Sequence, residues 1–212
     1  MNLFPMLQQR DIEQNPIRIG MIGAGKFGSM FLAQANRLPG IHVIGIADLN
    51  PSNARSNLAY VGWSAEKYTA TSLNDAVETG TSFVGDDWQA LVSHPAIDMI
   101  IECTGDPVAA VHHVITAFKQ GKNVINATVE ADAFCGAGLN QAAIEAGVVY
   151  SMAYGDQPAL TWGRVDWART CGFKVVAAGR GHKWLAKYRF STPETIWNYW
   201  GLTAEQAERG RL

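Results

Sequence analysis

The chain has 212 residues, 48% of them hydrophobic, and a formal net charge of −2 at pH 7. This length allows one large domain, or one domain and part of another, each with a buried core. Because there is no basic excess, we exclude nucleic acid as the main partner. No apolar run approaches the roughly 18 residues that cross a bilayer, so we expect no membrane partner.

The cysteines and the N-terminus point to a reducing compartment. Cys103, Cys135 and Cys171 are an odd number and lie far apart, which argues against a disulfide framework and against a cysteine metal motif. Residues 1–14 mix apolar and charged side chains without the continuous apolar core of a signal peptide. The sequence therefore predicts a cytoplasmic protein.

The most informative segment is a glycine turn between two predicted strands. The apolar strand 17–22 runs into a Gly-x-Gly-x-x-Gly turn, a helix is expected over 26–38, and a second strand, 41–47, ends at Asp48. This order forms the dinucleotide-binding fingerprint, in which the helix N-terminus faces the phosphates. The first glycine should allow a sharp turn, the second leave room for a pyrophosphate, and the third let helix and sheet pack closely. We assign to cofactor binding Gly23, Ala24, Gly25, Lys26, Phe27 and Gly28.

Further strands and helices alternate along the rest of the chain. Strands are expected at 83–84, 99–103, 123–127, 148–152 and 173–178, and helices at 51–60, 72–78, 86–92, 107–120, 138–146 and 158–171. This alternation predicts an α/β fold with a doubly wound, mostly parallel Rossmann sheet.

Three parts of the chain are expected. They are an N-terminal extension at 1–15, a Rossmann domain at 16–156, and the start of a catalytic or oligomerisation domain at 157–212. Aromatic residues gather between Phe190 and Trp200, ahead of a charged, helix-like end, with little chain left to cover them. Because such a cluster needs a partner surface, we expect either a longer protein or a homo-oligomer.

Residues near the second strand bear on the choice of cofactor. An acid at the position of Asp48 usually accepts a hydrogen bond from a ribose 2′-OH, and its charge disfavours a 2′-phosphate, which favours NAD. Asn50 follows closely, and Arg55 on the next helix offers a positive charge to a phosphate, which favours NADP. Both alternatives stay open at this stage, and Asp48, Asn50 and Arg55 are all assigned to the cofactor.

The end of the strand at 99–103 is expected to face the nicotinamide half. The residues here are small, and one of them has a hydroxyl group: Cys103, Thr104 and Gly105. Thr128 follows the next strand. We assign all four to cofactor binding. A plain strand-to-helix turn is the alternative for Thr104 and Gly105. The thiols of Cys103 and Cys135 have no histidine nearby in sequence, so buried cysteines are favoured over nucleophiles.

Acidic and basic side chains after later strands are candidates for catalysis. Glu130, Asp132 and Asp156 offer oxygen ligands to Mg²⁺ or Mn²⁺, although solvated surface acids are the alternative. Lys183 follows a glycine turn, where it would bind a developing alkoxide or a phosphate, unless it is a solvated lysine. We assign Lys183, Asp156 and Glu130 to catalysis. The pair at 112–113 receives no catalytic role, since one imidazole should face solvent and the other pack.

The segments 17–28, 47–51, 97–105 and 121–126 resemble the homoserine-dehydrogenase-like and glucose-fructose-oxidoreductase-like group over residues 17–152. More narrowly, the N-terminal extension, the long segment after Asp48, and residues 154–158 and 179–184 resemble the bacterial 1-deoxy-D-xylulose 5-phosphate reductoisomerase-like oxidoreductases. That resemblance implies an NADPH-dependent, divalent-metal-assisted conversion of 1-deoxy-D-xylulose 5-phosphate to 2-C-methyl-D-erythritol 4-phosphate, in isoprenoid precursor synthesis.

Two other functions remain open. One is a homoserine or related hydroxy-aldehyde dehydrogenase. With the reductoisomerase-like interpretation above, the substrate is therefore either a sugar phosphate or a hydroxy-aldehyde. The other is a sensor module that binds NAD(P) without turnover. One Rossmann scaffold serves many reactions, so the fold alone does not choose among them.

Overall fold

The computed structural model describes residues 3–153, 157–179, 185–192, 194–195, 199 and 203. The chain divides into two compact units, Met1–Ala159 and Leu160–Leu212.

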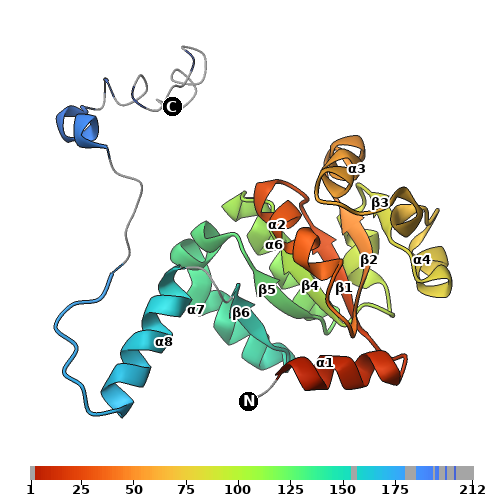
Figure 1. Cartoon of the computed structure of the whole chain (residues 1–212), viewed down its shortest axis with the longest axis horizontal. Coiled ribbons are helices and arrows are strands. Elements are labelled where there is room, and N and C mark those ends of the chain that lie inside the picture. The colour runs from red at the N-terminus through yellow and green to blue at the C-terminus, as the bar shows by residue number, and fades with distance from the viewer. Residues whose placement is uncertain are drawn as a thin grey trace. The chain divides into compact units, whose positions relative to one another are not determined.

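The first unit is built on a parallel sheet, which confirms the predicted α/β fold (Figure 1). Over the described residues its order is β3-β2-β1-β4-β5-β6, and every neighbouring pair is parallel. The order reverses between β1 and β4, and a sheet of this kind binds its ligands beyond the strand ends at that reversal. The strands are β1 (Ile17–Ile22), β2 (Ile41–Ala47), β3 (Phe83–Gly85), β4 (Met99–Glu102), β5 (Asn123–Asn126) and β6 (Tyr150–Met152).

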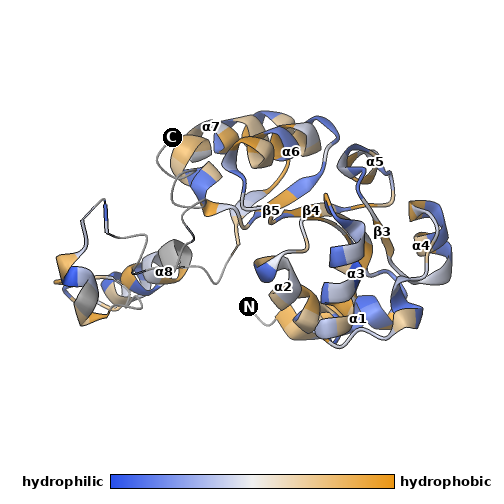
Figure 2. Cartoon of the chain, turned by 90° about the horizontal axis from the view of Figure 1, so that it is seen from above, coloured by the Kyte–Doolittle hydropathy of each residue, from blue (hydrophilic) through white to orange (hydrophobic). Residues whose placement is uncertain are grey.

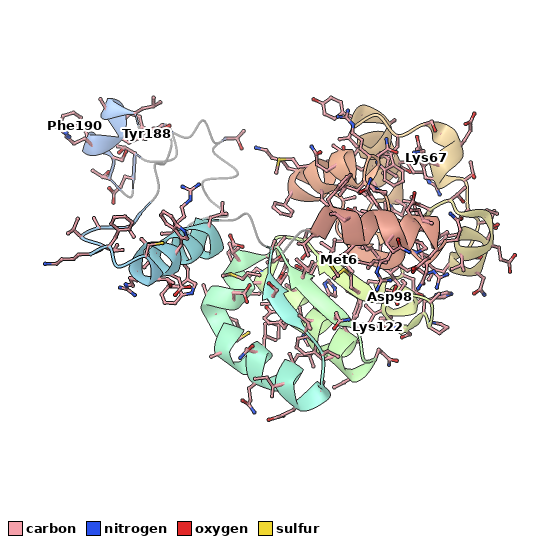
Figure 3. All side chains as sticks on the ribbon, turned by 60° about the horizontal axis from the view of Figure 1, so that its bottom comes forward. Met6, Lys67, Asp98, Lys122, Tyr188 and Phe190 are labelled. Atoms are coloured by element: carbon pink, nitrogen blue, oxygen red, sulfur yellow. The ribbon has the colours of Figure 1, made fainter. Side chains whose placement is uncertain are left out.

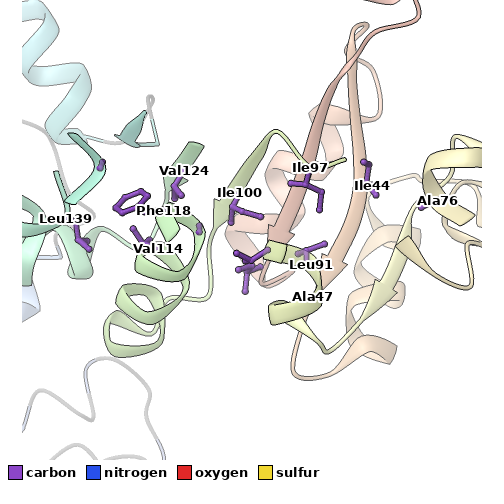
Figure 4. Packing of buried hydrophobic residues seen from close by; sticks show 14 of the residues in the cluster. Ile44, Ala47, Ala76, Leu91, Ile97, Ile100, Val114, Phe118, Val124 and Leu139 are labelled. Atoms are coloured by element: carbon purple, nitrogen blue, oxygen red, sulfur yellow. The ribbon is translucent and has the colours of Figure 1, made fainter. Parts of the chain in front are cut away.

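Helices cover both faces of the sheet, because the strands are apolar on both sides (Figure 2). On one face, Leu32 and Leu58 come from two of the helices and pack in one buried cluster. On the other face, Leu91, Phe118 and Leu139 join a second cluster, which Figure 4 shows at close range. The helices of this unit are α1 (Leu3–Ile12), α2 (Lys26–Ala35), α3 (Pro51–Tyr60), α4 (Leu73–Thr79), α5 (Trp88–Ser93), α6 (Pro107–Lys119) and α7 (Val129–Ala146), with a 3₁₀ turn η1 (Ala65–Tyr68).

The last of these helices is longer than the sequence predicted. The helix expected at 138–146 begins at Val129 instead, and Cys135 divides it with non-helical angles (φ −147°, ψ 21°). The prediction began this helix at Gly138 and placed residues 129–137 in no helix. In the first segment Ala131 is fully buried, and this packing against the rest of the unit stabilises the helix there.

The extension before β1 forms a helix, α1, that the sequence analysis did not predict. It rests on the turn before β2, where a Cβ on Gly40 would lie 2.1 Å from the carbonyl oxygen of Leu7. The backbone N–H of Gly40 also donates to the Asp11 carboxylate at 3.3 Å. Because Gly40 has no Cβ, the turn between α2 and β2 leaves room for the backbone of α1.

A buried lysine closes the amino end of the sheet, away from the expected ligand site. Lys122 donates from Nζ to the carbonyl oxygens of His94 at 2.9 Å and Ile97 at 2.7 Å. Burial lowers the pKa of Lys122, and the charge of Asp98 partly opposes this (both are labelled in Figure 3). Lys122 thus supplies hydrogen bonds to two backbone carbonyl groups that precede β4.

The second unit contains most of α8 (Gln157–Thr170), a helix that was predicted, and a 3₁₀ turn η2 (Ala186–Phe190). The predicted strand at 173–178 is wrong, since residues 173–179 have no regular structure and Phe173 and Val176 are exposed. A strand needs a neighbour to pair its backbone groups, and none is present in the described part of this unit. The charged end expected within 193–212 falls mostly outside the described residues. Among the helices that are described, none combines the length and the hydropathy needed to cross a bilayer.

Candidate functional site

A pocket of about 510 Å³ lies at the carboxyl ends of β1, β2 and β4. This is the edge at which the strand order reverses, where the fold predicts a ligand. The glycine loop and Asp48 contribute to its wall together with residues that follow β3 and β4. Its lining consists of Ile22, Gly23, Gly25, Ala47, Asp48, Leu49, Asn53, Asp86, Trp88, Cys103, Thr104, Asp106, Ala109 and His113.

The three glycines have the conformations expected of them. Gly23 has φ +91°, and a Cβ there would lie 2.8 Å from the Cys103 carbonyl oxygen. Gly25 has no atom within 4 Å of an added Cβ and lines the pocket. A Cβ on Gly28 would meet Met21 Cε at 2.5 Å. The loop thus turns at the first glycine, stays open at the second, and packs on the sheet at the third.

The N-terminus of α2 is open to an anion. Gly25 is its N-cap residue, and no side chain accepts a hydrogen bond there. By contrast, Asn50, Asp87 and Asp106 cap α3, α5 and α6 with their side chains. Unpaired N–H groups at the positive end of a helix are suited to a phosphate group. The first turn also carries Lys26 and Phe27, both exposed.

Asp48 is held against the glycine loop. One carboxylate oxygen accepts the N–H of Ala24 and the other the N–H of Asn50, both at 2.8 Å. The amide of Asn57 donates to the Ala24 carbonyl, also at 2.8 Å, so the loop is fixed from two sides. Asp48 lines the pocket and keeps further lone pairs with which to accept ribose hydroxyl groups.

The neighbours of Asp48 have mainly structural contacts. Asn50 caps α3 by accepting the N–H of Asn53 at 3.0 Å. Arg55 does not line the pocket, and its guanidinium donates to the carbonyl oxygens of Tyr68 at 2.9 Å and Val84 at 3.2 Å. This geometry favours a role in holding the segment before β3 over the expected neutralisation of a phosphate.

Cys103 is a buried thiol at the end of β4. Its Sγ donates to the carbonyl oxygen of Gly23 at 2.8 Å. Burial raises the pKa of this thiol strongly, and the nearby charges of Glu102 and Asp48 raise it further. Because the thiolate is the nucleophilic form, Cys103 is a packing residue that seats the glycine loop.

The carboxylate of Glu102, at the end of β4, joins the two loops next to the pocket. It is fully buried and accepts hydrogen bonds from the hydroxyl groups of Thr104 and Thr128. Thr128 Oγ1 in turn accepts the N–H of Gly105 at 3.0 Å. Thr104 lines the pocket, whereas Thr128 is buried and supports the turn that holds Gly105. The sequence analysis missed Glu102, because this residue lies within the apolar strand predicted at 99–103.

His113 is another pocket residue that the sequence analysis did not assign to the site. As predicted, one imidazole of the pair is exposed, that of His112, and the other is buried. His113 Nδ1 lies 3.2 Å from Glu102 Oε1, and its ring meets Trp88 edge-on, with centroids 4.5 Å apart. The pocket is therefore lined by an aromatic pair on α5 and α6.

The acidic candidates after β5 do not come together as a cation site. Glu130 is exposed, and the oxygens of Asp132 accept from Tyr150 at 2.7 Å and Asn126 at 2.9 Å. Burial raises the pKa of Asp132, while these two hydrogen bonds lower it. Within the described residues, no group of three His, Cys, Asp or Glu side chains is placed to hold a metal ion. Asp156 and Lys183 lie outside the described residues.

Two family models match the chain. Residues 17–126 match the oxidoreductase family with an NAD-binding Rossmann fold, and residues 155–212 match the catalytic domain of oxidoreductase DRL. A search of curated proteins gives no match.

Solved structures share the fold. An NAD binding oxidoreductase from Klebsiella pneumoniae is 21% identical with a TM-score of 0.51, covering 74% of this chain and 39% of that one. A homoserine dehydrogenase from Thiobacillus denitrificans is 22% identical with a TM-score of 0.52, covering 68% of this chain and 30% of that one. The chain thus spans well under half of either structure. The first family model matches more than half of the chain, which therefore belongs to the oxidoreductase family with an NAD-binding Rossmann fold.

Proposed function

We propose that the complete protein is an NAD(P)-dependent oxidoreductase in which residues 16–156 bind the dinucleotide and residues 157–212 belong to the catalytic domain. The observation that carries this proposal is the uncapped N-terminus of α2 beside an open glycine, Gly25, and the Asp48 carboxylate. These groups match a pyrophosphate and the adjoining ribose. The match of residues 155–212 to an oxidoreductase catalytic domain supports the second part.

The residues of the pocket fit a nicotinamide dinucleotide. N–H groups at the start of α2 would bind the pyrophosphate, and Asp48 would accept from ribose hydroxyl groups. Thr104, held by Glu102 at the end of β4, would position the nicotinamide half with the lone pairs of its hydroxyl oxygen. The bound cofactor would supply a hydride. The protein's part is to bind and orient it and to keep the loops around it in place.

For the reaction itself, we propose reduction of a sugar phosphate, namely conversion of 1-deoxy-D-xylulose 5-phosphate to 2-C-methyl-D-erythritol 4-phosphate. The substrate's carbon skeleton rearranges to an aldehyde, which takes a hydride from NADPH and a proton, and NADP⁺ leaves. Support comes from residues 154–158 and 179–184, which resemble the corresponding oxidoreductases. Lys183 is the proposed donor to the developing alkoxide, with Asp156 and Glu130 beside the substrate. The described residues do not fit a divalent cation, so no step is assigned to one.

We also propose that the catalytic unit meets another surface, in a homo-oligomer. Trp162 and Trp167 on α8 are 65% and 64% exposed, and large apolar side chains that face outward commonly mark an interaction surface. Light scattering on the native protein tests this. A monomeric mass over a wide concentration range contradicts it.

Oxidation of NADPH by the full-length protein tests the proposed reaction. We expect turnover with 1-deoxy-D-xylulose 5-phosphate, measured with and without Mg²⁺ or Mn²⁺, and none with a Gly25→Val variant that keeps its fold. Homoserine is tested in the opposite direction, by reduction of NADP⁺, and hydroxy-aldehydes are tested by oxidation of NADPH. If dinucleotide binds but no sugar phosphate or hydroxy-aldehyde supports turnover, the catalytic proposal is wrong and a sensor function takes its place.

A further inference from the structure

A buried carboxylate ends β4, one of the two central strands of the sheet. Glu102 is fully buried, and among the described residues no lysine or arginine lies within ion-pair distance of it. The residue paired with it on β1 is apolar, Ile22. Burial of a carboxylate costs free energy that its hydrogen bonds must offset, and an apolar side chain often stabilises a core equally well. The stability of the sheet therefore does not explain an acid at this position.

The Glu102 carboxylate bonds to residues that line the pocket or support its loops. Oε1 accepts the hydroxyl group of Thr104 and, at 3.3 Å, the backbone N–H of the same residue. His113 Nδ1 lies 3.2 Å from the same oxygen. Oε2 accepts the hydroxyl group of Thr128. Because Thr104 and His113 both line the pocket, one carboxylate fixes two parts of its wall.

A second buried residue fixes Thr128 from the other side. Asn126, which pairs with Glu102 across β4 and β5, accepts the N–H of Thr128 and donates to its carbonyl oxygen, both at 3.1 Å. Thr128 Oγ1 then accepts the N–H of Gly105 at 3.0 Å. The turn after β4 is thus held at Thr104 by Glu102 and at Gly105 by Thr128. Since both connections lead back to Glu102, loss of its carboxylate would release both residues of the turn.

The strand order places this turn beside the nicotinamide half of a bound dinucleotide. The strands β2, β1 and β4 are neighbours in that order, and they are followed by Asp48, the glycine loop and Thr104. A pyrophosphate at the glycine loop, with the adenosine ribose at Asp48, leaves the side of β4 for the other nucleotide. Thr104 is exposed on that side and lines the pocket.

We infer that Glu102 is a positioning residue for the cofactor: its buried carboxylate fixes the turn at Thr104 and Gly105 against which the nicotinamide half is held. The inference rests on the proposed function, since it needs a dinucleotide in the pocket. The carboxylate acts through the turn and does not itself touch the cofactor. A carboxamide is no substitute, because its nitrogen only donates, whereas Thr104 and Thr128 both need an acceptor.

Comparison of NADH with ADP-ribose tests the inference, because ADP-ribose has both riboses and the pyrophosphate but no nicotinamide ring. Calorimetric titration of the full chain gives both dissociation constants, and NADPH with 2′-phospho-ADP-ribose forms a second pair. We expect the wild type to bind the dinucleotide about tenfold tighter, which corresponds to one or two hydrogen bonds. In Glu102→Gln this ratio should fall below about threefold, while binding of ADP-ribose stays within about twofold of the wild type.

Further variants separate positioning from a structural role. Thr104→Val should lower the ratio as Glu102→Gln does, and the two changes together should lower it no further, because they act on one contact. Thr104→Ser keeps the hydroxyl group and should keep the ratio. Lys122→Met is the matched control, since it removes a buried, hydrogen-bonded group at the amino end of the sheet. That variant should lose stability in urea denaturation and keep the wild-type ratio.

The outcomes distinguish the two proposals. If the wild type binds none of the four ligands, the proposed function fails and this inference fails with it. If the wild type binds each dinucleotide and its ADP-ribose counterpart equally, or if Glu102→Gln keeps the tenfold ratio, the proposed function stands and the role of Glu102 is overturned. Equal weakening of both ligands in Glu102→Gln also overturns it. Should that variant fail to fold, Thr128→Val removes the other hydroxyl group that Glu102 holds, and an unchanged ratio there overturns the inference.

Discussion

The carboxylate of Asp48 accepts the backbone N–H of Ala24 at 2.8 Å, so the acid expected to read the cofactor's ribose also fastens the glycine loop. Its second oxygen accepts the N–H of Asn50. Discrimination at the 2′ position and the shape of the phosphate cradle therefore depend on one side chain. A substitution at Asp48 should affect both.

Removing the charge of Asp48 should change the preference between NADPH and NADH. We expect Asp48→Asn to shift the ratio of their dissociation constants about tenfold toward NADPH, because a like charge near a 2′-phosphate costs roughly 1 to 4 kcal/mol at contact distance. Asp48→Ala should show the same shift with weaker binding of both, because the loop loses its anchor. Fluorescence titration measures the constants. Asp86→Asn, in the same pocket but not bonded to the loop, is the control, and an equal shift in that variant contradicts the prediction.

Alanine at two of the glycines should separate binding from stability. Gly25→Ala meets no atom within 4 Å, so we expect a free energy of unfolding within about 0.5 kcal/mol of wild type and dinucleotide binding at least about tenfold weaker. Gly28→Ala brings its Cβ to 2.7 Å from the backbone carbonyl oxygen of Gly23 as well as to 2.5 Å from Met21 Cε, and should cost about 1 to 3 kcal/mol. Urea denaturation and dinucleotide titration on both variants give the comparison. A stable Gly28→Ala protein would refute the packing argument.

Cys103 should be chemically inert. Burial raises the pKa of its thiol, so it stays protonated near neutral pH, whereas Cys171 is exposed. Alkylation of the native protein with iodoacetamide, followed by mass spectrometry of peptides, should label Cys171 at least about tenfold faster than Cys103. Cys103→Ser should not abolish turnover. Rapid labelling of Cys103, or loss of turnover with binding intact, would restore the nucleophile hypothesis.

Asp132 and Tyr150 should give the stability a defined pH dependence. Burial raises the pKa of Asp132 above its ordinary value of 3.8, so the folded state holds this proton more tightly than the unfolded state. Its contribution to the free energy of unfolding is therefore greatest in acid and declines as pH rises through the interval between the two pKa values. Asp132→Asn removes this titration. From about pH 4 upward, the free energy of unfolding of the wild type should therefore fall relative to that of the variant.

The hydroxyl of Tyr150 opposes the effect of burial on Asp132, because its hydrogen bond stabilises the carboxylate. Tyr150→Phe should raise the pKa of Asp132 further and cost about 1 kcal/mol at neutral pH. Carbon-detected NMR of aspartate carboxyl groups follows the titration directly. An unchanged or lower pKa of Asp132 in Tyr150→Phe contradicts the assignment.

Local patterns were sufficient to predict the sheet and the glycine loop. The apolar strands and the spacing from Gly28 to Asp48 depend on residues close together in sequence, and both are found in the structure. The strand predicted at 173–178 failed because an apolar run shows propensity and not a pairing partner. The start of α7 was misplaced because the burial of Ala131, in the segment before Cys135, cannot be seen in the sequence.

Local sequence patterns could not predict the hydrogen-bond network around Glu102. Glu102 meets partners 2, 11 and 26 residues away, in the turn after β4, on α6 and in the turn before α7. No spacing rule joins these positions. Only the pairing of β4 with β5, and the packing of α6 against both, brings the hydroxyl groups and the imidazole to one carboxylate. Arg55 illustrates the converse, since its proximity to Asp48 in sequence did not place it in the pocket.

The weak packing of α1 against Gly40 affects local unfolding of the first unit. The helix buries none of its residues, and its contacts with Gly40 are backbone proximity and one long hydrogen bond to Asp11. Segments with few buried contacts detach at a small fraction of the global free energy. Amide hydrogen exchange in α1 should therefore be much faster than exchange in β1 and β4, and detachment of α1 would expose the turn before β2 while the dinucleotide pocket stays intact.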